Sequence, residues 1–383
     1  MKIAITFGFF LPVPPVSGGA MEKIFFNIGR RLADRGHEVS TFTRQWKDWP
    51  QHEVIDGVSY HRVPGWNHTA QLWRNLILDF RWGLRLRRVL PRDAIVVANN
   101  VSLPIQLRRG LSPHPSPVSV VLGRMPKGQV RFYQGVDRIY ATSEAVAARA
   151  RYENPAATPR IKVLRNSIDW QAQQGPDTAP RDRLRIGFAG RIHPEKGLDL
   201  LMKAAALLNR DTSLPNWEIT LVGPVDTAAG GGGTAFRDSL IALAETNGAG
   251  HRITFLPPAW DPMVLAAHYR SFAAFCYPSR AEKGEGLSVA PIEAMAAGAV
   301  PVLSKLDCYE DLIVPGQNGL LFDHRAKNAP AQLAAALTEV LRNTARRKSL
   351  ANEAKMTAKA FDYDALAEEL DVDLNKLLVQ RPQ

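Results

Sequence analysis

Short apolar runs that alternate with segments of helical periodicity are the feature that most constrains the fold of this chain. Each run has the length of a buried strand, and the segment after it repeats its apolar residues with the period of a helix. This order is typical of parallel sheets covered by helices, so we expect an α/β protein with doubly wound sheets. The expected strands are residues 3–7, 38–42, 94–98, 117–122, 138–141 and 161–164 in the first half and 184–189, 218–222, 253–256, 273–277, 300–303 and 320–322 in the second.

The length of the chain indicates two domains. Its 383 residues, of which 45% are hydrophobic, exceed the ~150 residues of an average domain. Residues 166–182 are polar and lack periodicity, which predicts an interdomain linker. We therefore expect an N-terminal domain at residues 1–165, a C-terminal domain at 183–365 and a terminal segment at 366–383.

Cysteine usage and hydropathy exclude several protein classes. Cys276 and Cys308 cannot build a disulfide framework, and neither has the spacing to His or Cys that a zinc site requires. The most apolar stretch, residues 287–304, is interrupted by Glu293 and by two prolines, so it falls short of the ~18 apolar residues of a membrane span. We expect a reduced, cytoplasmic protein.

Positive charge is concentrated in the first half of the chain. Residues 1–180 contain 25 Lys and Arg against 13 Asp and Glu, whereas the remainder contains 23 against 24. Such asymmetry favours contact of the first half with a polyanion, either nucleic acid or an anionic membrane surface.

A predicted helix at residues 71–90 carries part of this charge. Four arginines share one narrow stripe of the helix, with Trp73 and Trp82 nearby. Basic helices with aromatic flanks can lie on anionic membranes, although a solvated face above a core-packing face is an equally good interpretation. The four residues are Arg74, Arg81, Arg85 and Arg88.

Glycines follow the first expected strand. Ser17, Gly18 and Gly19 precede a predicted helix, where backbone N–H groups and the helix N-terminus could approach an anion. Tight packing turns look the same, so this motif alone is weak. Residues 1–20 also have the outline of a secretory signal, but the strand and glycine loop fit them better.

A second motif lies in residues 190–197, directly after an expected strand and before a helix. In open α/β sheets, ligands bind at the carboxyl ends of strands. Arg191 supplies a planar fork and Lys196 a compact cation, a combination suited to a diphosphate. Two solvated loop cations are the alternative. Residues 230–233, four consecutive glycines, are expected to form a flexible surface insertion because no Lys-Ser/Thr follows them.

The third motif is a loop at residues 278–288 that leads into a helix at 289–298. Glu285 lies on the loop, and Glu293 lies eight positions later inside the apolar helix, for which Ser288 is the expected N-cap. A carboxylate in an apolar helix is costly to bury without a partner. Sugar hydroxyls are natural partners, and a structural arginine is the alternative.

These segments resemble, in the same order, the retaining glycosyltransferase family 4. The resemblance implies a GT-B fold, in which two Rossmann-like domains face each other across a cleft and a C-terminal helix returns to the first domain. It extends over nearly the whole chain and is most specific in the second half. The residues that carry it are 17–19, 35–39, 163–169, 190–197, Glu285, Glu293 and 314–322.

The resemblance also implies roles for particular residues. Arg191 and Lys196 would hold the donor diphosphate, Glu293 the ribose hydroxyls and Glu285 the hydroxyls of the transferred sugar. Backbone N–H groups would add hydrogen bonds to the phosphates. These N–H groups belong to Gly18, Gly19, Gly286, Leu287, Ser288 and Val289, and Gly190 is a further expected donor-binding residue.

Metal-independent transfer with retention of the anomeric configuration is a further implication of the resemblance, with the leaving phosphate receiving the acceptor proton. No Asp-x-Asp sequence is expected on a loop, because residues 371–373 fall in a helical pattern. We therefore expect no cofactor and no metal.

The sequence departs from the family pattern on the acceptor side. Many members carry a histidine after the strands that end here near residues 98 and 122, whereas this chain offers Asn99, Asn100 and Arg124. Residues 285–288 also lack the aromatic residue and second glycine of the common pattern.

We expect a hexosyltransferase that moves a sugar from a nucleotide diphosphate sugar to a saccharide or lipid-linked saccharide, in cell-envelope or exopolysaccharide synthesis. The expected location is the cytoplasm, with the basic first domain on the inner face of the membrane and no nucleic acid bound. The alternatives are a nucleotide-sugar epimerase and a non-catalytic module that binds membrane or nucleic acid. A dinucleotide oxidoreductase is disfavoured because Gly-x-Gly-x-x-Gly is absent after the first strand.

Overall fold

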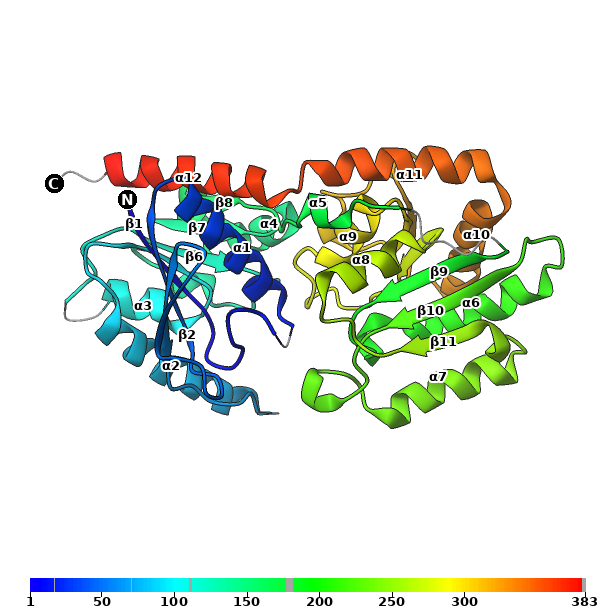
Figure 1. Ribbon diagram of the computed structural model, residues 1–383, viewed down its shortest axis with the longest axis horizontal. Coiled ribbons are helices and arrows are strands. Elements are labelled where there is room, and N and C mark those ends of the chain that lie inside the picture. Colours follow the sequence, from blue (N-terminus) through cyan, green and yellow to red (C-terminus); the bar gives the residue numbers. More distant parts are fainter. Residues whose placement is uncertain (17, 70, 110–111, 177–181, 381–383) are drawn as a thin grey trace. The chain divides into compact units, whose positions relative to one another are not determined.

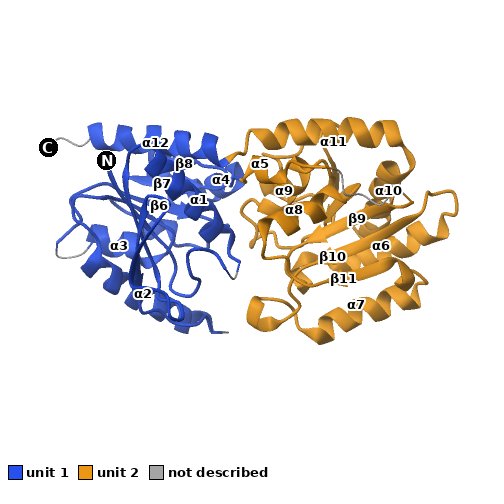
Figure 2. Cartoon of the chain, viewed as in Figure 1, with its two compact units in different colours: residues 1–167, 363–383 blue, residues 168–362 orange. Residues whose placement is uncertain are grey.

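The chain forms two compact units, each built around its own parallel sheet (Figure 2). The computed structural model describes residues 1–16, 18–69, 71–109, 112–176 and 182–380. The first unit comprises residues 1–167 and 363–383, and the second comprises residues 168–362. All the strands expected from the sequence are present, so the α/β class is confirmed.

The first unit contains an eight-stranded sheet in the order β3-β4-β2-β1-β5-β6-β7-β8 (Figure 1). Apart from β3, its strands run parallel to their neighbours. The strands are β1 (Lys2–Thr6), β2 (Glu38–Arg44), β3 (His52–Ile55), β4 (Val58–Val63), β5 (Ile95–Ala98), β6 (Val118–Leu122), β7 (Arg138–Ala141) and β8 (Ile161–Val163). The helices are α1 (Ala20–Asp34), α2 (Leu72–Val89), α3 (Ser102–Arg109), α4 (Glu144–Glu153) and α12 (Tyr363–Val379), with 3-10 turns at Val130–Phe132 and Pro155–Arg160.

The hairpin β3–β4 is the part of this sheet that the sequence analysis missed. Its turn consists of Asp56 and Gly57, both with positive φ, as two-residue hairpin turns require. Asp-Gly between short strand-like runs is a known hairpin signal. The run before it is weak, because β3 is at most half-buried and Val54 points to solvent.

Helix α2 is held against α3 and the end of β1 by Trp82, Asp79 and Gly83. Trp82 is fully buried, and its indole N–H donates to the Phe7 carbonyl oxygen at 2.8 Å. Asp79 accepts from the backbone N–H of Ser102 at 2.8 Å. A Cβ on Gly83 would lie within 3 Å of the Gln106 amide. These contacts fix which face of α2 is buried.

Helix α12 brings the end of the chain back to the first unit. Its Asp373 is buried and accepts hydrogen bonds from Arg138 Nε and Tyr140 Oη, both at 2.8 Å. Burial and the negative charge of Asp373 raise the pKa of Tyr140. His37 adds a contact at 2.8 Å to Asp371, so both acids of the Asp-x-Asp triplet hold the helix in place.

The second unit contains a six-stranded sheet in the order β11-β10-β9-β12-β13-β14, and all its strand pairs are parallel. Its strands are β9 (Leu184–Ala189), β10 (Trp217–Val222), β11 (Ile253–Leu256), β12 (Ala274–Tyr277), β13 (Val300–Ser304) and β14 (Leu320–Phe322). Its helices are α5 (Trp170–Gln173), α6 (Leu198–Arg210), α7 (Thr234–Thr246), α8 (Pro262–Arg270), α9 (Val289–Ala296), α10 (Ala329–Arg342) and α11 (Thr344–Lys359), with 3-10 turns η3 (Pro194–Lys196), η4 (Thr227–Ala229), η5 (Gly250–Arg252) and η6 (Asp307–Tyr309).

Part of the expected linker belongs to the second unit. Helix α5 lies within residues 166–182, and its Trp170 and Gln173 are buried. Gln174 donates to the carbonyl oxygen of Ala296 at 3.3 Å, and Lys355 lies over the Trp170 ring. The polar composition concealed this short helix, whereas residues 177–181 lie outside the described part of the chain.

We predict that Asp373→Ala lowers the free energy of unfolding of the first unit by about 3 kcal/mol, because it leaves the largely buried Arg138 guanidinium and the buried Tyr140 hydroxyl without their acceptor. Urea unfolding monitored by tryptophan fluorescence measures the change.

The matched control is Asp364→Ala on the same helix. Asp364 pairs with Arg31, but its side chain is 72% exposed, so the loss should be about 0.5 kcal/mol. Equal losses in the two variants would mean that Asp373 does not anchor α12.

Candidate functional site

The second and third sequence motifs meet at one edge of the second sheet. Strands β9 and β12 are parallel neighbours, and each motif begins directly after the carboxyl end of one of them. The carboxyl ends of parallel strands are where open α/β sheets bind ligands. Adjacent strands therefore bring together two loops that lie about ninety positions apart in the sequence.

The first loop is shaped by glycine and by histidine. His193 accepts the backbone N–H of Glu195 at 3.2 Å and so starts the turn η3. Gly197 ends the turn in the left-handed conformation, with φ of 64°. A Cβ there would lie 2.1 Å from the Pro278 carbonyl oxygen of the second loop. Glycine is thus required for the close approach of the two loops.

Lys196 and Glu285 form a buried ion pair between these loops. The Lys196 side chain is 7% exposed and the Glu285 side chain 11%, and Lys196 Nζ donates to Glu285 Oε1. Ser288 Oγ donates to the other carboxylate oxygen at 2.6 Å, and Ser279 Oγ donates to Oε1 at 3.0 Å. Tyr277 stands beside the pair, with its ring centroid 5.1 Å from Lys196 Nζ.

Both partners of this pair are charged at neutral pH. Burial by itself would raise the pKa of the Glu285 carboxyl, but Lys196 and the serine hydroxyls hold it below its ordinary value of 4.5. Burial would likewise lower the pKa of Lys196, yet Tyr277 and Glu285 raise it. An ammonium has three N–H groups, so Lys196 can donate to a bound anion while it contacts Glu285.

Arg191 lies on the same loop as Lys196 and remains partly open to solvent. Its guanidinium contacts the Glu195 carboxylate and donates to the Gly230 carbonyl oxygen at 3.1 Å. The backbone N–H of Gly232 donates to the Ile192 carbonyl oxygen at 2.7 Å. The glycines at 230–233 are therefore packed against the Arg191 loop, and the expectation of a loose surface insertion is wrong.

Glu293 is buried in helix α9, as its place in an apolar helix predicts. Tyr269 Oη donates to its carboxylate at 3.0 Å. The Tyr269 ring packs edge-on against Phe275, with centroids 5.7 Å apart, and Phe275 stacks on Tyr277 at 6.0 Å. The rings of Tyr269, Phe275 and Tyr277 thus form a row that extends from Glu293 to the Lys196–Glu285 pair.

The backbone between Glu285 and α9 contains the remaining donor-side candidates of the second unit. Leu287 is buried, and Val289 begins the helix. Ser288 occupies the N-cap position but makes no side-chain capping bond, because its hydroxyl donates to Glu285 and accepts from Tyr309 Oη at 3.1 Å. The Ser288 hydroxyl thus binds the Glu285 carboxylate instead of the backbone N–H groups at the start of α9, to which N-cap rules assign it.

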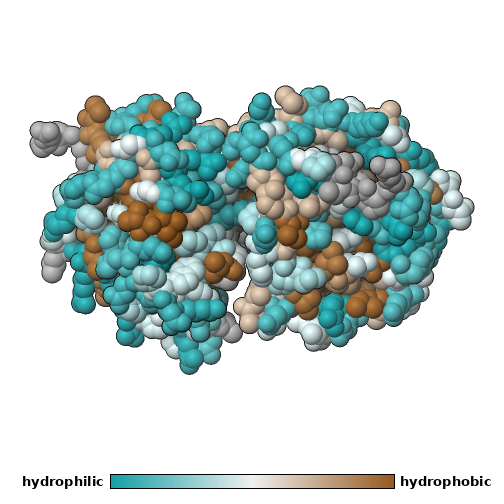
Figure 3. All heavy atoms as spheres, viewed as in Figure 1, coloured by the Kyte–Doolittle hydropathy of each residue, from teal (hydrophilic) through white to brown (hydrophobic). Residues whose placement is uncertain are grey.

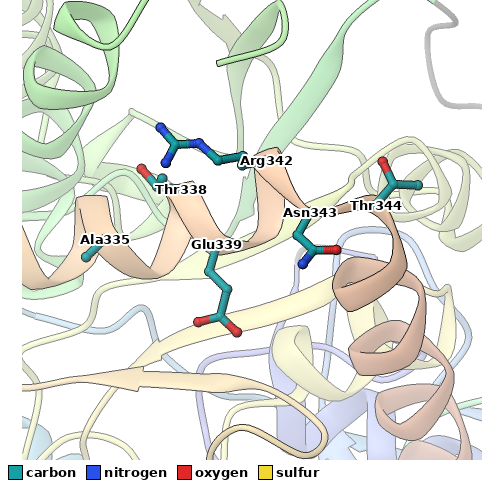
Figure 4. Close-up of a pocket in the computed structure, with 6 residues that line it drawn as sticks. All are labelled: Ala335, Thr338, Glu339, Arg342, Asn343 and Thr344. Carbon is teal, nitrogen blue, oxygen red and sulfur yellow. The ribbon is translucent and has the colours of Figure 1, made fainter. Parts of the chain in front are cut away.

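Cavities in the described part of the second unit include one near the strand ends and one away from them. One, of about 230 Å³, lies at the carboxyl ends of β10 and β11, among Gly223, Phe255 and Leu256. The other, of about 480 Å³, lies on α10, where Glu339 and Arg342 extend to different sides of the helix (Figure 4). These two side chains already pair with Arg346 and Asp211. Of these two, only the first lies at the same carboxyl edge of the sheet as the two loops, beside β9.

In the first unit, the glycines after β1 have a structural role. Gly18 and Gly19 have positive φ, while Ser17 lies outside the described residues. A Cβ on Gly19 would lie 2.2 Å from a carboxylate oxygen of Glu22. Burial raises the pKa of Glu22 to about 7. Sequence reasoning missed Glu22, because nothing in the local pattern distinguishes it from an ordinary acid in the first turn of a helix.

The acceptor-side candidates follow β5 and β6 in the first unit. Asn99 and Asn100 come directly after β5, and Thr6 Oγ1 donates to Asn100 Oδ1 at 3.4 Å. Among the residues that the structure describes, neither polar atom of the Asn99 side chain has a hydrogen-bond partner. Arg124 is exposed, and its charge acts on Glu22. Arg124 and Glu22 thus lie near each other, and Asn99 offers unused hydrogen-bonding capacity.

Metal-ligating side chains do not cluster in the described part of the chain. No group of three His, Cys, Asp or Glu side chains there is placed to hold an ion. Cys276 and Cys308 are both buried free thiols. None of the described helices is long and apolar enough to cross a bilayer.

Part of the chain matches one family model, and nearly all of it is similar to known proteins. Residues 171–357 match the family model described as Glycosyl transferases group 1. The chain is 27% identical to a D-inositol 3-phosphate glycosyltransferase of Thermomonospora curvata, over 92% of this chain and 89% of that protein. It superposes on sucrose-phosphate synthase from Thermosynechococcus elongatus with a TM-score of 0.80 and 19% identity, over the full length of both chains. An E. coli structure titled trehalose-6-phosphate, bound with UDP-2-fluoro glucose, gives a TM-score of 0.73 and 14% identity over 98% and 99% of the two chains.

We predict that Lys196→Met lowers the free energy of unfolding by about 3 kcal/mol at neutral pH, because the buried Glu285 carboxylate loses its counter-charge. The folded pKa of Glu285 is depressed, so this stabilisation is present above pH 4.5 and is lost as the pH falls through the lower folded pKa. Urea unfolding at neutral and acidic pH measures both effects.

Two further variants test the assignment. Lys196→Met/Glu285→Met removes both charges and should lose less stability than the single variant. Arg280→Met breaks an exposed pair with Asp199 and should cost about 0.5 kcal/mol. A pH-independent effect of Lys196→Met would contradict the assignment.

Proposed function

We propose, since residues 171–357 match the Glycosyl transferases group 1 model and the fold is GT-B, that the chain transfers a hexose from a nucleoside diphosphate sugar to a hydroxyl of a saccharide or lipid-linked saccharide. Transfer proceeds with retention of the anomeric configuration and without a metal ion or other cofactor. The observation that carries this proposal is the buried Lys196–Glu285 pair at the carboxyl ends of β9 and β12, beside Arg191.

The donor diphosphate is bound by Arg191 and Lys196. Cleavage of a glycosyl–phosphate bond leaves negative charge on the departing diphosphate, and fixed cations stabilise that charge without reorganisation. Lys196 is held by Glu285 and Tyr277, so its ammonium is positioned before the donor arrives. Arg191 adds a planar fork suited to phosphate oxygens.

The nucleoside and the transferred sugar are bound by the two carboxylates and by the nearby cavity. Glu285 accepts hydrogen bonds from sugar hydroxyls, and Glu293 accepts them from the ribose. The cavity of about 230 Å³ at the ends of β10 and β11 accommodates the base. Backbone N–H groups of residues 286–289 contact the phosphates. The Gly190 N–H already donates to the Val222 carbonyl oxygen at 2.9 Å.

Retention follows if the leaving phosphate accepts the proton of the attacking hydroxyl. This route needs cations around the phosphate rather than a second carboxylate, and the residues that follow β9 provide them. Asn99, Asn100 and Arg124 orient the acceptor, and the unpartnered amide of Asn99 supports that role.

Two acceptor classes are supported by different observations. A lipid-linked saccharide of cell-envelope or exopolysaccharide synthesis fits the basic first unit, which would work at the inner face of the membrane. A phosphorylated polyol or sugar fits the name of the Thermomonospora curvata relative, and Arg124 suits its phosphate. Assays with each class of acceptor distinguish them.

We predict that Glu285→Gln lowers the transfer rate at least about 100-fold, because the contact to the sugar weakens and Lys196 loses its anchor. Activity is measured with nucleotide sugars in turn, and the product anomer is determined by NMR, with retention expected. Glu282→Gln is the matched control, since Glu282 lies on the same loop and is half-exposed. Unchanged turnover of Glu285→Gln with every donor would exclude the proposed role.

A second prediction concerns ligand binding without metal. In the presence of EDTA, at least one of UDP, GDP, ADP and TDP should raise the melting temperature, because Arg191 and Lys196 neutralise the diphosphate. Lys196→Met should reduce this shift more than Lys203→Met, which removes a half-exposed lysine of α6. Stabilisation by NAD alone would overturn the donor assignment.

A further inference from the structure

Helix α2 presents a set of large apolar side chains outward and buries two polar residues together with Trp82 and Leu86. Its buried residues include Asn75 and Asp79, whereas seven of its large apolar side chains are exposed. The described residues contain twenty exposed side chains of this kind, so one helix of 18 residues holds a third of them. The seven are Leu72, Trp73, Leu76, Ile77, Phe80, Leu84 and Val89.

The outward apolar residues form a continuous stripe. Each of Trp73, Leu76, Ile77, Phe80 and Leu84 lies three or four positions from another member of the set, which places them along one face of the helix. They are between 39% and 58% exposed. On the face of the protein in Figure 3, hydrophobic side chains form separate patches within a largely hydrophilic surface. Isolated patches are ordinary, but a stripe along a whole helix marks an interaction site.

This helix cannot turn its apolar stripe inward. The Trp82 N–H bond to Phe7, the Asp79 bond to Ser102 and the contact of Gly83 with Gln106 all lie on the opposite side. Rotation would break these contacts and expose the largest fully buried side chain of the unit, Trp82.

Arginines line the outward face beside the apolar stripe. Arg74, Arg81 and Arg88 are exposed, and Arg85 is half-buried over the Trp66 ring at 4.1 Å. Among the described residues, none of these four arginines forms an ion pair. Asp79, the one acidic residue of α2, is buried. The face is therefore apolar and cationic, with no neutralising carboxylate.

The whole net charge of the protein lies in the unit that carries this face. Residues 1–167 and 363–383 contain 27 Lys and Arg against 16 Asp and Glu, whereas residues 168–362 contain 21 of each. Long-range attraction to an anionic surface would therefore act on the first unit alone.

We propose that α2 lies on an anionic lipid bilayer, with its apolar stripe at the level of the acyl boundary and its arginines among the headgroups. An interfacial helix needs both features, a large apolar face and adjacent basic residues. Aromatic rings such as Trp73 suit the interface. The bilayer surface is thus contacted by a defined element, independently of which donor or acceptor the enzyme uses.

Other occupants fit the face less well. In a symmetric dimer through α2, the same patch would meet itself and oppose its own arginines. A nucleic acid would engage the arginines through phosphates but would leave the apolar side chains without a partner. Of these three occupants, only a lipid surface offers contacts to both the apolar stripe and the arginines beside it.

Flotation of the full-length protein with vesicles tests the proposal. We expect binding to vesicles of phosphatidylcholine with phosphatidylglycerol, weak binding to phosphatidylcholine alone, and loss of binding as salt shortens the Debye length from about 10 Å at 0.1 M to about 3 Å at 1 M. Equal binding to both vesicle types, or no binding to either, would overturn the proposal.

Two variants test the arginines and the apolar stripe separately. Arg74→Gln/Arg81→Gln/Arg88→Gln should weaken binding on the order of 100-fold, at about fivefold for each arginine. Ile77→Ser/Phe80→Ser should weaken it about tenfold or more by removing apolar contact. Full binding by either variant would contradict the proposal.

Matched controls remove the same kinds of side chain elsewhere. Lys327→Gln/Lys348→Gln/Lys359→Gln removes three exposed charges of the second unit, and Met356→Ser/Val372→Ser removes two exposed apolar side chains. Both controls should bind as the wild type does. A loss of vesicle binding equal to that of the α2 variants would mean that overall charge or non-specific hydrophobic adsorption, not this helix, determines binding.

Two further measurements separate bilayer binding from self-association and from donor binding. Light scattering without vesicles should give the same mass for the wild type and Ile77→Ser/Phe80→Ser, because a change from dimer to monomer would identify the face as a subunit interface and overturn the proposal. The melting shift with UDP should be equal in all α2 variants. That shift depends on the donor site, so failure of the transferase proposal and failure of the bilayer proposal are distinguishable.

Discussion

The buried contact between the Lys196 ammonium and the Glu285 carboxylate is the interaction on which the candidate site depends. Each charge would be costly to bury alone, and together with the hydroxyls of Ser279 and Ser288 they satisfy each other. The contact requires the two loops to approach within the space that Gly197 leaves free. A local requirement for glycine and a long-range charge pair are thus parts of one arrangement.

The two units differ in net charge. The second unit is electrically neutral and concentrates its buried charges at the strand ends, where a diphosphate would be recognised by a few fixed groups. The first unit carries the excess positive charge and displays it on α2. Helix α12 completes the first unit through Asp373, so the last residues of the chain stabilise the sheet that its first residues begin.

Sequence reasoning predicted some features of the site correctly and missed others. It identified Lys196 and Glu285 as partners of one ligand, and the structure brings their side chains into contact. It assigned Ser288 to the helix end, but the carboxylate of Glu285 competes successfully for that hydroxyl. It treated residues 230–233 as an insertion, although their backbone packs on the Arg191 loop. Sequence reasoning missed Glu22 because its burial, not a sequence pattern, distinguishes it from other acidic residues at the start of a helix.

The sequence by itself determined the α/β class, the strands, the basic first half and the motifs after β9 and β12, because periodicity, composition and spacing are local properties. Only the tertiary structure decided which side chains meet and which face of α2 is buried. Those outcomes depend on the order of strands in the sheet and on anchors such as Trp82. The arginine stripe could be read from helical spacing, whereas the apolar stripe beside it became visible only once the buried face was known.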